Sequence, residues 1–184
     1  SKTSGVDFAR ILQPLNHIAK QPGFAVKIWD NSQDSNVSWD EVTKEYDFIY
    51  TSYTPNDWGY AAMGCFARKN GCKIIYDVDD NLWDILKDNP AYETYHTGSK
   101  PLYLLSCILQ DVDYVTVTNQ FLKHAMAHKV PLEYEKLKVF PNYVDFDIYK
   151  YTPKFKDTND LHITHFGSTT HFSSLQEANF INAI

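Results

Sequence analysis

Short β-branched runs alternate with longer runs of helical spacing along this chain, and this alternation constrains its fold more than any other feature. The pattern is typical of βαβ units, in which each helix crosses over to the next parallel strand. We expect strands at residues 24–29, 47–51, 72–76, 114–118, 137–140 and 161–166. The sequence therefore predicts an α/β fold with a Rossmann-like parallel sheet flanked by helices.

Apolar residues at helical spacing predict the helices. We expect them at residues 6–20, 58–69, 102–109 and 120–128. Pro14 should kink or restart the first of them, because proline has no N–H to donate within a helix. Ser38, with Glu41 three residues later, predicts an N-cap with a capping box for a further short helix, and Asn119 predicts the cap of the helix at 120–128.

The last part of the sequence has the pattern of a domain that is beginning. Residues 151–159 are linker-like, and the strand at 161–166 is followed by a glycine turn and a helix start. We therefore divide the chain into a domain at 1–157 and the start of a second Rossmann-like domain at 158–184. The first domain opens on a helix, so we expect a strand before it and interpret the chain as a fragment cut at both ends.

Composition narrows the partners and the compartment. The formal net charge is −6, and an acidic chain repels phosphate backbones, so we expect no nucleic acid partner. No stretch approaches a membrane span and no signal peptide is visible, which leaves only peripheral membrane contact open. Cys65, Cys72 and Cys107 are an odd number without a CxxC pair, which favours free thiols in a reducing, cytoplasmic compartment.

Three carboxylates, Asp77, Asp79 and Asp80, follow the expected strand at 72–76. In open α/β sheets, ligands bind at the carboxyl ends of the strands. Carboxylates crowded there favour protons or cations, so they could act as a base, as ligands of an acceptor hydroxyl or as metal ligands. We favour such a role over the alternative that one of them caps the next helix and the others are solvated.

Two glycine turns are candidate phosphate sites, because free N–H groups at a helix N-terminus hold phosphate. The first turn comprises Gly167, Ser168, Thr169 and Thr170, with His171 just after it. The second contains Gly5, and Arg10 lies one helical turn further on, where it could reach an anionic ligand. Taken alone, an ordinary strand-to-helix turn explains each glycine turn better, and a surface arginine is the more frequent explanation of Arg10.

Several strong signatures are absent from the sequence. No GxSxG, Walker loop, complete GxGxxG or paired-cysteine metal site occurs, which disfavours serine hydrolases, P-loop NTPases and ordinary dehydrogenases. His124 and His128 are one helical turn apart, as metal ligands can be, but they lack the glutamate of an HExxH motif. We interpret them as a solvated helix face and predict no metal site.

Five segments, in order along nearly the whole chain, carry a resemblance. They are GVDFARILQPL with the strand expected after it, IIYDVDDNLWDILKDNPAY, VTVTNQFLK, VFPNYVDFDIY and ITHFGSTTHFSSL. Together they resemble bacterial and phage glycosyltransferases of the two-domain GT-B type, related to glycosyl transferases group 1. The likeness is strongest at PNYVD, which is similar to a P-N-x-V-D-x-x-x-[FY] motif that precedes the second domain of that family.

The resemblance implies two Rossmann-like domains across a cleft, with residues 1–157 on the acceptor side. It implies transfer of a sugar, with retained configuration, from a nucleotide diphosphate sugar to a hydroxyl of a carbohydrate or other acceptor, without a metal or a permanently bound cofactor. Asp79 and Asp80 would stand at the catalytic strand end, while Gly5 and residues 167–170 would approach the donor phosphates. Other donor-binding residues of the family lie further on, so this piece alone should be inactive.

Three other functions stay open from the sequence. The run IIYDVDDNLWD is close to the first motif of haloacid dehalogenase-type phosphatases, with Asp77 as nucleophile, Asp79 as acid-base and a Mg²⁺ between them. Asp77 and Asp79 could instead hold Mn²⁺ in a GT-A glycosyltransferase. The aromatic residues around 143–151 could serve a non-catalytic α/β binding domain.

Overall fold

The computed structural model of the chain describes residues 5–29, 37–52, 57–143, 145–147 and 150. The segment expected to open a second domain, 158–184, lies outside the described residues, together with its strand at 161–166 and the turn from Gly167 to His171. The described residues belong to the first expected domain.

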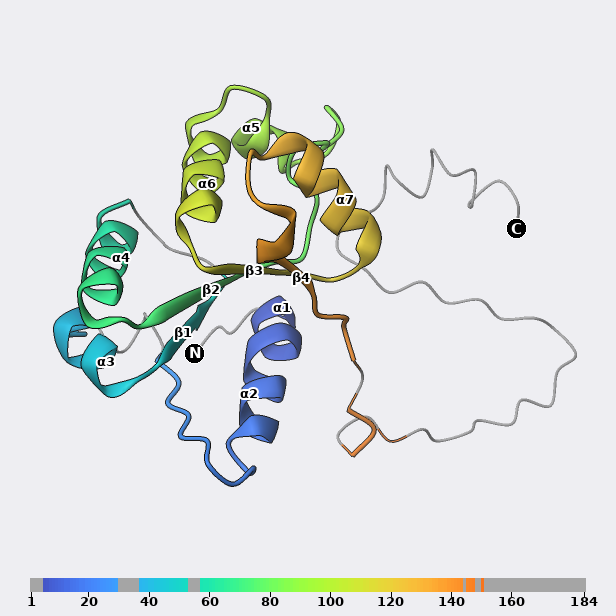
Figure 1. Ribbon diagram of the computed structural model, residues 1–184. Coiled ribbons are helices and arrows are strands. Elements are labelled where there is room, and N and C mark those ends of the chain that lie inside the picture. Colours follow the sequence, from blue (N-terminus) through green and yellow to red (C-terminus); the bar gives the residue numbers. More distant parts are fainter. Residues whose placement is uncertain (1–4, 30–36, 53–56, 144, 148–149, 151–184) are drawn as a thin grey trace, which may run out of the picture.

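Four parallel strands form one sheet, in the spatial order β1-β2-β3-β4 (Figure 1). They are β1 (Phe48–Thr51), β2 (Lys73–Val78), β3 (Tyr114–Val117) and β4 (Leu137–Val139). The strands predicted between residues 47 and 140 are thereby confirmed to within two residues at each end. The α/β class with a parallel, Rossmann-like sheet is confirmed for this part of the chain.

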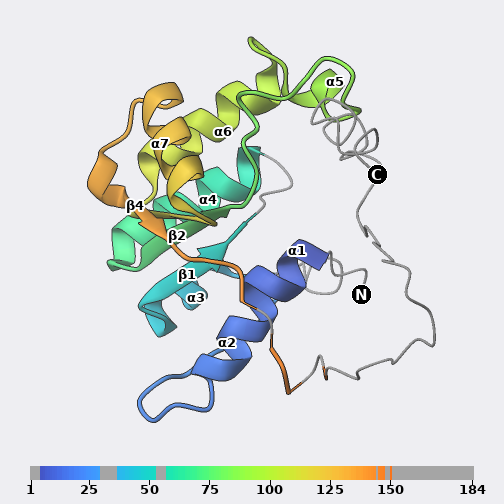
Figure 2. The same ribbon diagram turned by 90° about the vertical axis from the view of Figure 1, so that its right-hand side faces the viewer.

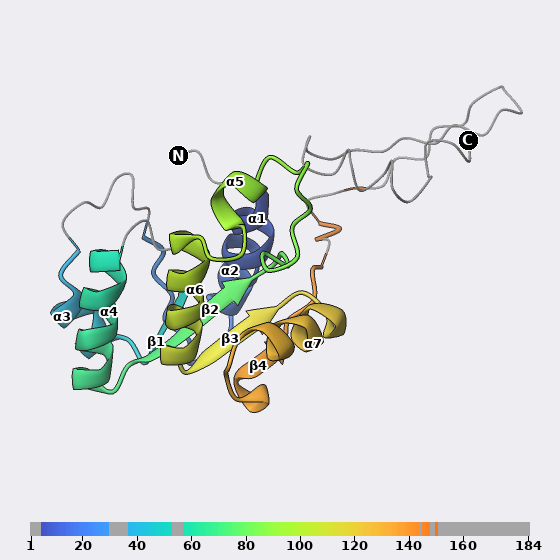
Figure 3. The same ribbon diagram turned by 90° about the horizontal axis from the view of Figure 1, so that it is seen from above.

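Helices on one face of the sheet connect successive strands. From residue 39 onward the helical elements are α3 (Trp39–Glu45), α4 (Asp57–Asn70), α5 (Tyr92–Tyr95), α6 (Lys100–Asp111), α7 (Gln120–Lys129) and the short 3₁₀ turn η2 (Tyr134–Lys136). Right-handed crossovers that progress in one direction along a sheet all fall on the same side of it. Accordingly, α4, α6 and α7 lie side by side over one face (Figures 1 and 3). None of the described helices is long and apolar enough to cross a bilayer.

The opposite face is covered by the first helical stretch, formed by α1 (Gly5–Asp7), the π-helical turn η1 (Phe8–Leu12) and α2 (Gln13–Ile18). Figure 2 shows this stretch on the other side of the strands from α6 and α7. The predicted interruption is confirmed. The N–H of Gln13 donates to the carbonyl of Phe8, a wide i to i−5 turn, directly before Pro14. Proline crowds the carbonyl four residues before it, and a widened turn accommodates that crowding.

The predicted caps have different outcomes. Asn119 caps α7, with its Oδ1 accepting from the Leu122 N–H at 2.9 Å. Ser38 is the N-cap residue of α3, as predicted, but its side chain makes no capping hydrogen bond. The capping-box geometry expected from Glu41 therefore does not form.

The strand expected at residues 24–29 is wrong. The segment has no strand pairing in the structure, and Phe24 and Ile28 are exposed. No ladder of hydrogen bonds joins this segment to a strand of the described sheet, and a strand is stable only when paired. Trp29 instead packs edge to face on Tyr46, with ring centroids 5.4 Å apart.

The core lies between the sheet and the helices α4, α6 and α7. Strand residues in register, such as Ile74, Tyr76, Val115 and Val117, are buried and belong to it. The helices contribute Met63, Ala67, Leu109, Leu122 and Met126. Because successive strand residues face opposite sides, the intervening residues of these strands face the first helical stretch, and this second face is partly polar.

Truncation of the core should be costly. Leu109 is fully buried, so we expect Leu109→Ala to lower the free energy of unfolding by about 2–5 kcal/mol. Leu86 is 38% exposed, and Leu86→Ala should change it by no more than about 0.5 kcal/mol. Urea denaturation of both variants checks this, and similar losses in the two would contradict the assignment of Leu109 to the core.

Candidate functional site

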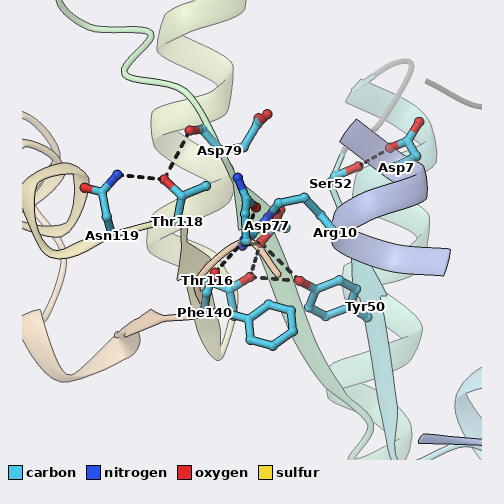
Figure 4. Close-up of polar contacts among 11 residues, drawn as sticks. Asp7, Arg10, Tyr50, Ser52, Asp77, Asp79, Thr116, Thr118, Asn119 and Phe140 are labelled. Carbon is cyan, nitrogen blue, oxygen red and sulfur yellow. Dashed lines mark hydrogen bonds and ion pairs between the residues drawn. The ribbon is translucent and has the colours of Figure 1, made fainter. Parts of the chain in front are cut away.

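Polar residues gather where the parallel strands end, at one edge of the sheet (Figure 4). Asp79 and Asp80 follow β2, and Thr118 and Asn119 follow β3. The sequence predicted that edge as the ligand side of the sheet. The first turn of α1 lies beside the same edge, because Asp7 Oδ1 accepts from the Oγ of Ser52, just after β1, at 3.0 Å.

A buried ion pair joins Arg10 of the first helical stretch to Asp77 of β2, next to this edge of the sheet. The Arg10 Nε donates to Asp77 Oδ2 at 2.7 Å, and Nη2 donates to Oδ1 at 2.5 Å. Their side chains are only 2% and 1% exposed. The second amino group, Nη1, donates to the carbonyl of Phe140 and to Asn142 Oδ1, both just after β4. One side chain of the first helical stretch thus reaches the central strand β2 and the exit of the edge strand β4.

Two hydroxyls complete the surroundings of Asp77. The hydroxyls of Tyr50 and Thr116 both donate to its Oδ1, at 3.1 and 2.5 Å. Thr116 is the register partner of Asp77 on β3, and Tyr50 lies on the same face of β1. Burial raises the pKa of Tyr50, and the negative charge of Asp77 adds to that rise. Tyr50 therefore stays protonated and can donate.

The charge of the pair is well compensated. Burial acts to lower the pKa of the Arg10 guanidinium, but the hydrogen bond to Asp77 and its negative charge outweigh that effect and raise the pKa. Arg10 keeps its proton, and both oxygens of Asp77 accept hydrogen bonds. A bidentate arginine–carboxylate pair with further donors is the geometry in which a buried pair recovers its cost of desolvation.

These contacts bear on two sequence predictions. The alternative of an ordinary surface arginine at Arg10 is wrong, because the side chain is buried in the ion pair. A role for Arg10 in binding an anionic sugar donor stays a prediction. It is not favoured, because Nε, Nη1 and Nη2 of Arg10 already donate hydrogen bonds within the protein. Gly5 begins α1 at the ligand edge, and its approach to donor phosphates also stays a prediction.

A shallow pocket of about 270 Å³ opens at the ends of β2 and β3. Its polar lining and one aromatic ring come from Asp79, Asp80, Asn81, Thr118, Asn119 and Phe121. The two predicted catalytic carboxylates therefore lie together in one concave site. No arginine, lysine or histidine lines it among the described residues.

The two carboxylates of the pocket differ. Partial burial raises the pKa of Asp79 above its ordinary value of 3.8, and the negative charge of Asp80 adds to the rise. A hydrogen bond from the Asp79 backbone and the charge of Arg10 oppose it only in part. Asp80 is exposed, and no described side chain pairs with it. The site thus combines one partly buried acid with a raised pKa and one free carboxylate.

The neighbouring groups are largely occupied with one another. Thr118 Oγ1 donates to the Asp79 carbonyl at 3.4 Å and accepts from Asn119 Nδ2 at 3.1 Å. Asn81 Nδ2 donates to Asp84 Oδ2 at 3.0 Å, while its Oδ1 is buried without a partner among the described residues. These hydrogen bonds hold the loop after β2 and the start of α7, which together form one side of the pocket.

Several residues of this region were not predicted from the sequence. The sequence nevertheless marks Thr116, because it is a polar residue inside the apolar strand run YVTV. In the sheet it lies in register with Asp77. The sequence also marks Phe121, since it lies two positions after the cap residue Asn119 and off the buried stripe of α7. His124 and His128 are exposed, as predicted, and His124 stacks on Tyr134.

Comparison of the chain with protein-family models, with curated proteins and with solved structures finds no match. The α/β fold with its four-stranded parallel sheet is what the structure establishes.

Breaking the buried pair should destabilise the protein strongly. We expect Arg10→Met to lower the free energy of unfolding by about 3–5 kcal/mol, because it leaves Asp77 as a buried charge without its partner. The matched control is Arg68→Met, which breaks an exposed pair with Asp111 and should cost less than about 1 kcal/mol. Chemical denaturation measures both. Equal small losses would mean that the first helical stretch does not depend on the pair.

The raised pKa of Asp79 predicts a pH-dependent gain from its neutralisation. An ionised Asp79 weakens the folded state at pH 7, so Asp79→Asn should unfold at higher urea concentration there. The gain should shrink as the pH falls through the raised folded-state pKa and vanish below the ordinary value of 3.8, where both side chains are neutral. Asp88→Asn, at an exposed position outside the pocket, is the control. A gain that does not change with pH would contradict this account.

Proposed function

We propose that the pocket at the ends of β2 and β3 binds the hydroxyl acceptor of a glycosyl transfer from a nucleotide diphosphate sugar, and that Asp79 takes the acceptor proton. One observation carries the proposal. A partly buried carboxyl with a raised pKa lies beside a free carboxylate in a concave site at the carboxyl edge of a parallel sheet.

The chemistry needs little more than placement and a base. The acceptor hydroxyl attacks the anomeric carbon, the bond from that carbon to the diphosphate breaks, and the hydroxyl proton passes to Asp79. A single displacement of this kind inverts the configuration at the anomeric carbon, so the proposal departs here from the retention that the resemblance implies. A carboxyl pKa raised toward neutrality makes a stronger base, provided that the group is still ionised at the working pH. Asp80 lies beside it and can accept a hydrogen bond from a second acceptor hydroxyl, which would orient the nucleophile.

The charge of the pocket favours the acceptor over the donor. Two carboxylates without a lining cation repel a diphosphate, whereas they attract hydroxyl hydrogens. We therefore assign the donor phosphates to groups outside the pocket. Gly5 at the start of α1 and residues 167–170 remain the candidates, with the latter outside the described residues.

The buried ion pair disfavours the rivals that need Asp77. As a phosphatase nucleophile or a Mn²⁺ ligand, Asp77 would have to give up the guanidinium of Arg10, and its side chain is 1% exposed. A cation beside it would also meet the positive charge of Arg10. A non-catalytic binding domain keeps the same pocket and differs only in lacking turnover.

The test compares the full-length protein with its Asp79→Asn variant. With UDP-glucose, UDP-galactose and GDP-mannose as donors, wild type should release nucleoside diphosphate in the presence of a suitable hydroxyl acceptor. Asp79→Asn should lower that rate by about 10²–10⁴-fold, the usual contribution of a general base. Asp88→Asn, an exposed carboxylate outside the pocket, should retain the wild-type rate.

The other outcomes are also informative. An unchanged rate in Asp79→Asn would remove this residue from the reaction. Binding of hydroxyl compounds without release of nucleoside diphosphate from any nucleotide sugar would favour the non-catalytic binding domain instead.

A further inference from the structure

Phe121 is an unusually exposed aromatic residue at the mouth of the pocket. Its side chain is 88% exposed, the highest value among the exposed large hydrophobic residues of the described chain. It stands in the first turn of α7, while its neighbour Leu122 is buried in the core. The helix therefore does not need Phe121 for packing, and the apolar ring stays in water.

The surroundings of the ring leave room for a flat ligand. Ala125 lies one helical turn after Phe121 and also lines the pocket, so on the pocket side of the helix the next side chain is only a methyl group. Asn119 is held by its cap to the Leu122 N–H, which fixes the start of the helix and hence the position of the ring's backbone. The ring face is therefore an accessible apolar wall of the site, continued by Leu122 and Ala125, and it lies opposite polar side chains from the ends of β2 and β3.

The hydrogen-bonding groups of the pocket are mostly acceptors. The Asp80 carboxylate has no partner among the described residues, and Asp79 offers a second carboxyl. Thr118 and Asn119 already use donors and acceptors on each other. A complementary ligand therefore supplies several donating hydroxyls together with an apolar face.

A pyranose ring has both features. Its hydroxyls project around the rim, and its axial C–H groups form an apolar face whose partial positive charge suits the negative face of an aromatic ring. A simple alkyl alcohol or a serine side chain has only one hydroxyl and no such face. A diphosphate is repelled by the carboxylates.

We propose that the acceptor is a pyranoside whose apolar face stacks on Phe121 while its hydroxyls donate to Asp80 and Asp79. This assignment of the acceptor class rests on the function proposed above, but the binding it describes does not require turnover. Phe121 acts as a specificity-determining residue that selects a sugar ring.

Binding to the chain of residues 1–184 tests the proposal directly. The ligands are the methyl α-pyranosides of glucose, galactose and mannose, with the acyclic polyol mannitol for comparison, followed by saturation-transfer NMR and titration calorimetry. We expect at least one pyranoside to bind more tightly than mannitol. Phe121→Ala should weaken that binding by about five- to tenfold, the value of one aromatic contact, and Phe121→Trp should retain it.

Tyr103→Ala is the matched control. Tyr103 is a 67% exposed aromatic residue on α6 that does not line the pocket, so its loss should leave pyranoside binding unchanged. Circular dichroism verifies that each variant is folded. Since Phe121 is nearly free of contacts, its removal should not disturb the fold.

The outcomes separate this inference from the proposed function. If Phe121→Ala binds pyranosides as wild type does, or if no pyranoside binds more tightly than mannitol, the stacking proposal is overturned, whatever Asp79→Asn does to turnover. If pyranosides bind through Phe121 but no nucleotide sugar is turned over by the full-length protein, the sugar site stands and the transferase proposal fails.

Discussion

The ion pair between Arg10 and Asp77 is the interaction on which the arrangement of the described domain depends. Arg10 spans 67 residues of sequence to Asp77 and 130 to Phe140, so it joins the first helical stretch, the central strand and the exit of the last strand. Charges are costly to bury, and the cost is offset here because Tyr50, Thr116 and the Phe140 carbonyl complete the network. If the first helical stretch were shifted along the sheet by one turn, Arg10 could not reach both Asp77 and the Phe140 carbonyl. The network therefore also fixes the position of this stretch on the sheet.

The ion pair also gives the three carboxylates of the DVDD segment different environments. Asp77 faces the first helical stretch and pairs with Arg10 there, whereas Asp79 and Asp80 emerge at the edge, where no described cationic side chain lines the pocket. Burial and the charge of Asp80 therefore dominate at Asp79, and its pKa rises. Asp77 thus has a structural role in the buried ion pair, whereas Asp79 and Asp80 are accessible to a ligand in the pocket.

The sequence predicted the strands of the sheet and the main helices, because periodicity and caps are local signals. It failed at residues 24–29, where an apolar run has strand character but no described partner, since pairing is not a property of one segment. It correctly placed Asp79 and Asp80 at the carboxyl edge of the sheet, because the strand that precedes them is recognisable from its own residues. It missed the partnership of Arg10 with Asp77, which depends on how distant elements pack, and it missed Phe121, whose exposure only becomes visible once Leu122 is seen to fill the core.

The depth of the Arg10–Asp77 pair separates it from the other ion pairs in its response to dissolved salt. Ions in solution screen charges that water can reach, and the pairs Lys44–Asp40, Arg68–Asp111 and Lys129–Asp84 all have substantially exposed members. A pair sealed between a helix and a sheet has no such access. High ionic strength should therefore weaken the exposed ion pairs of the helices while leaving the connection between the first helical stretch and the sheet nearly unaffected, so the domain is least sensitive to its ionic surroundings where its charges are most deeply buried.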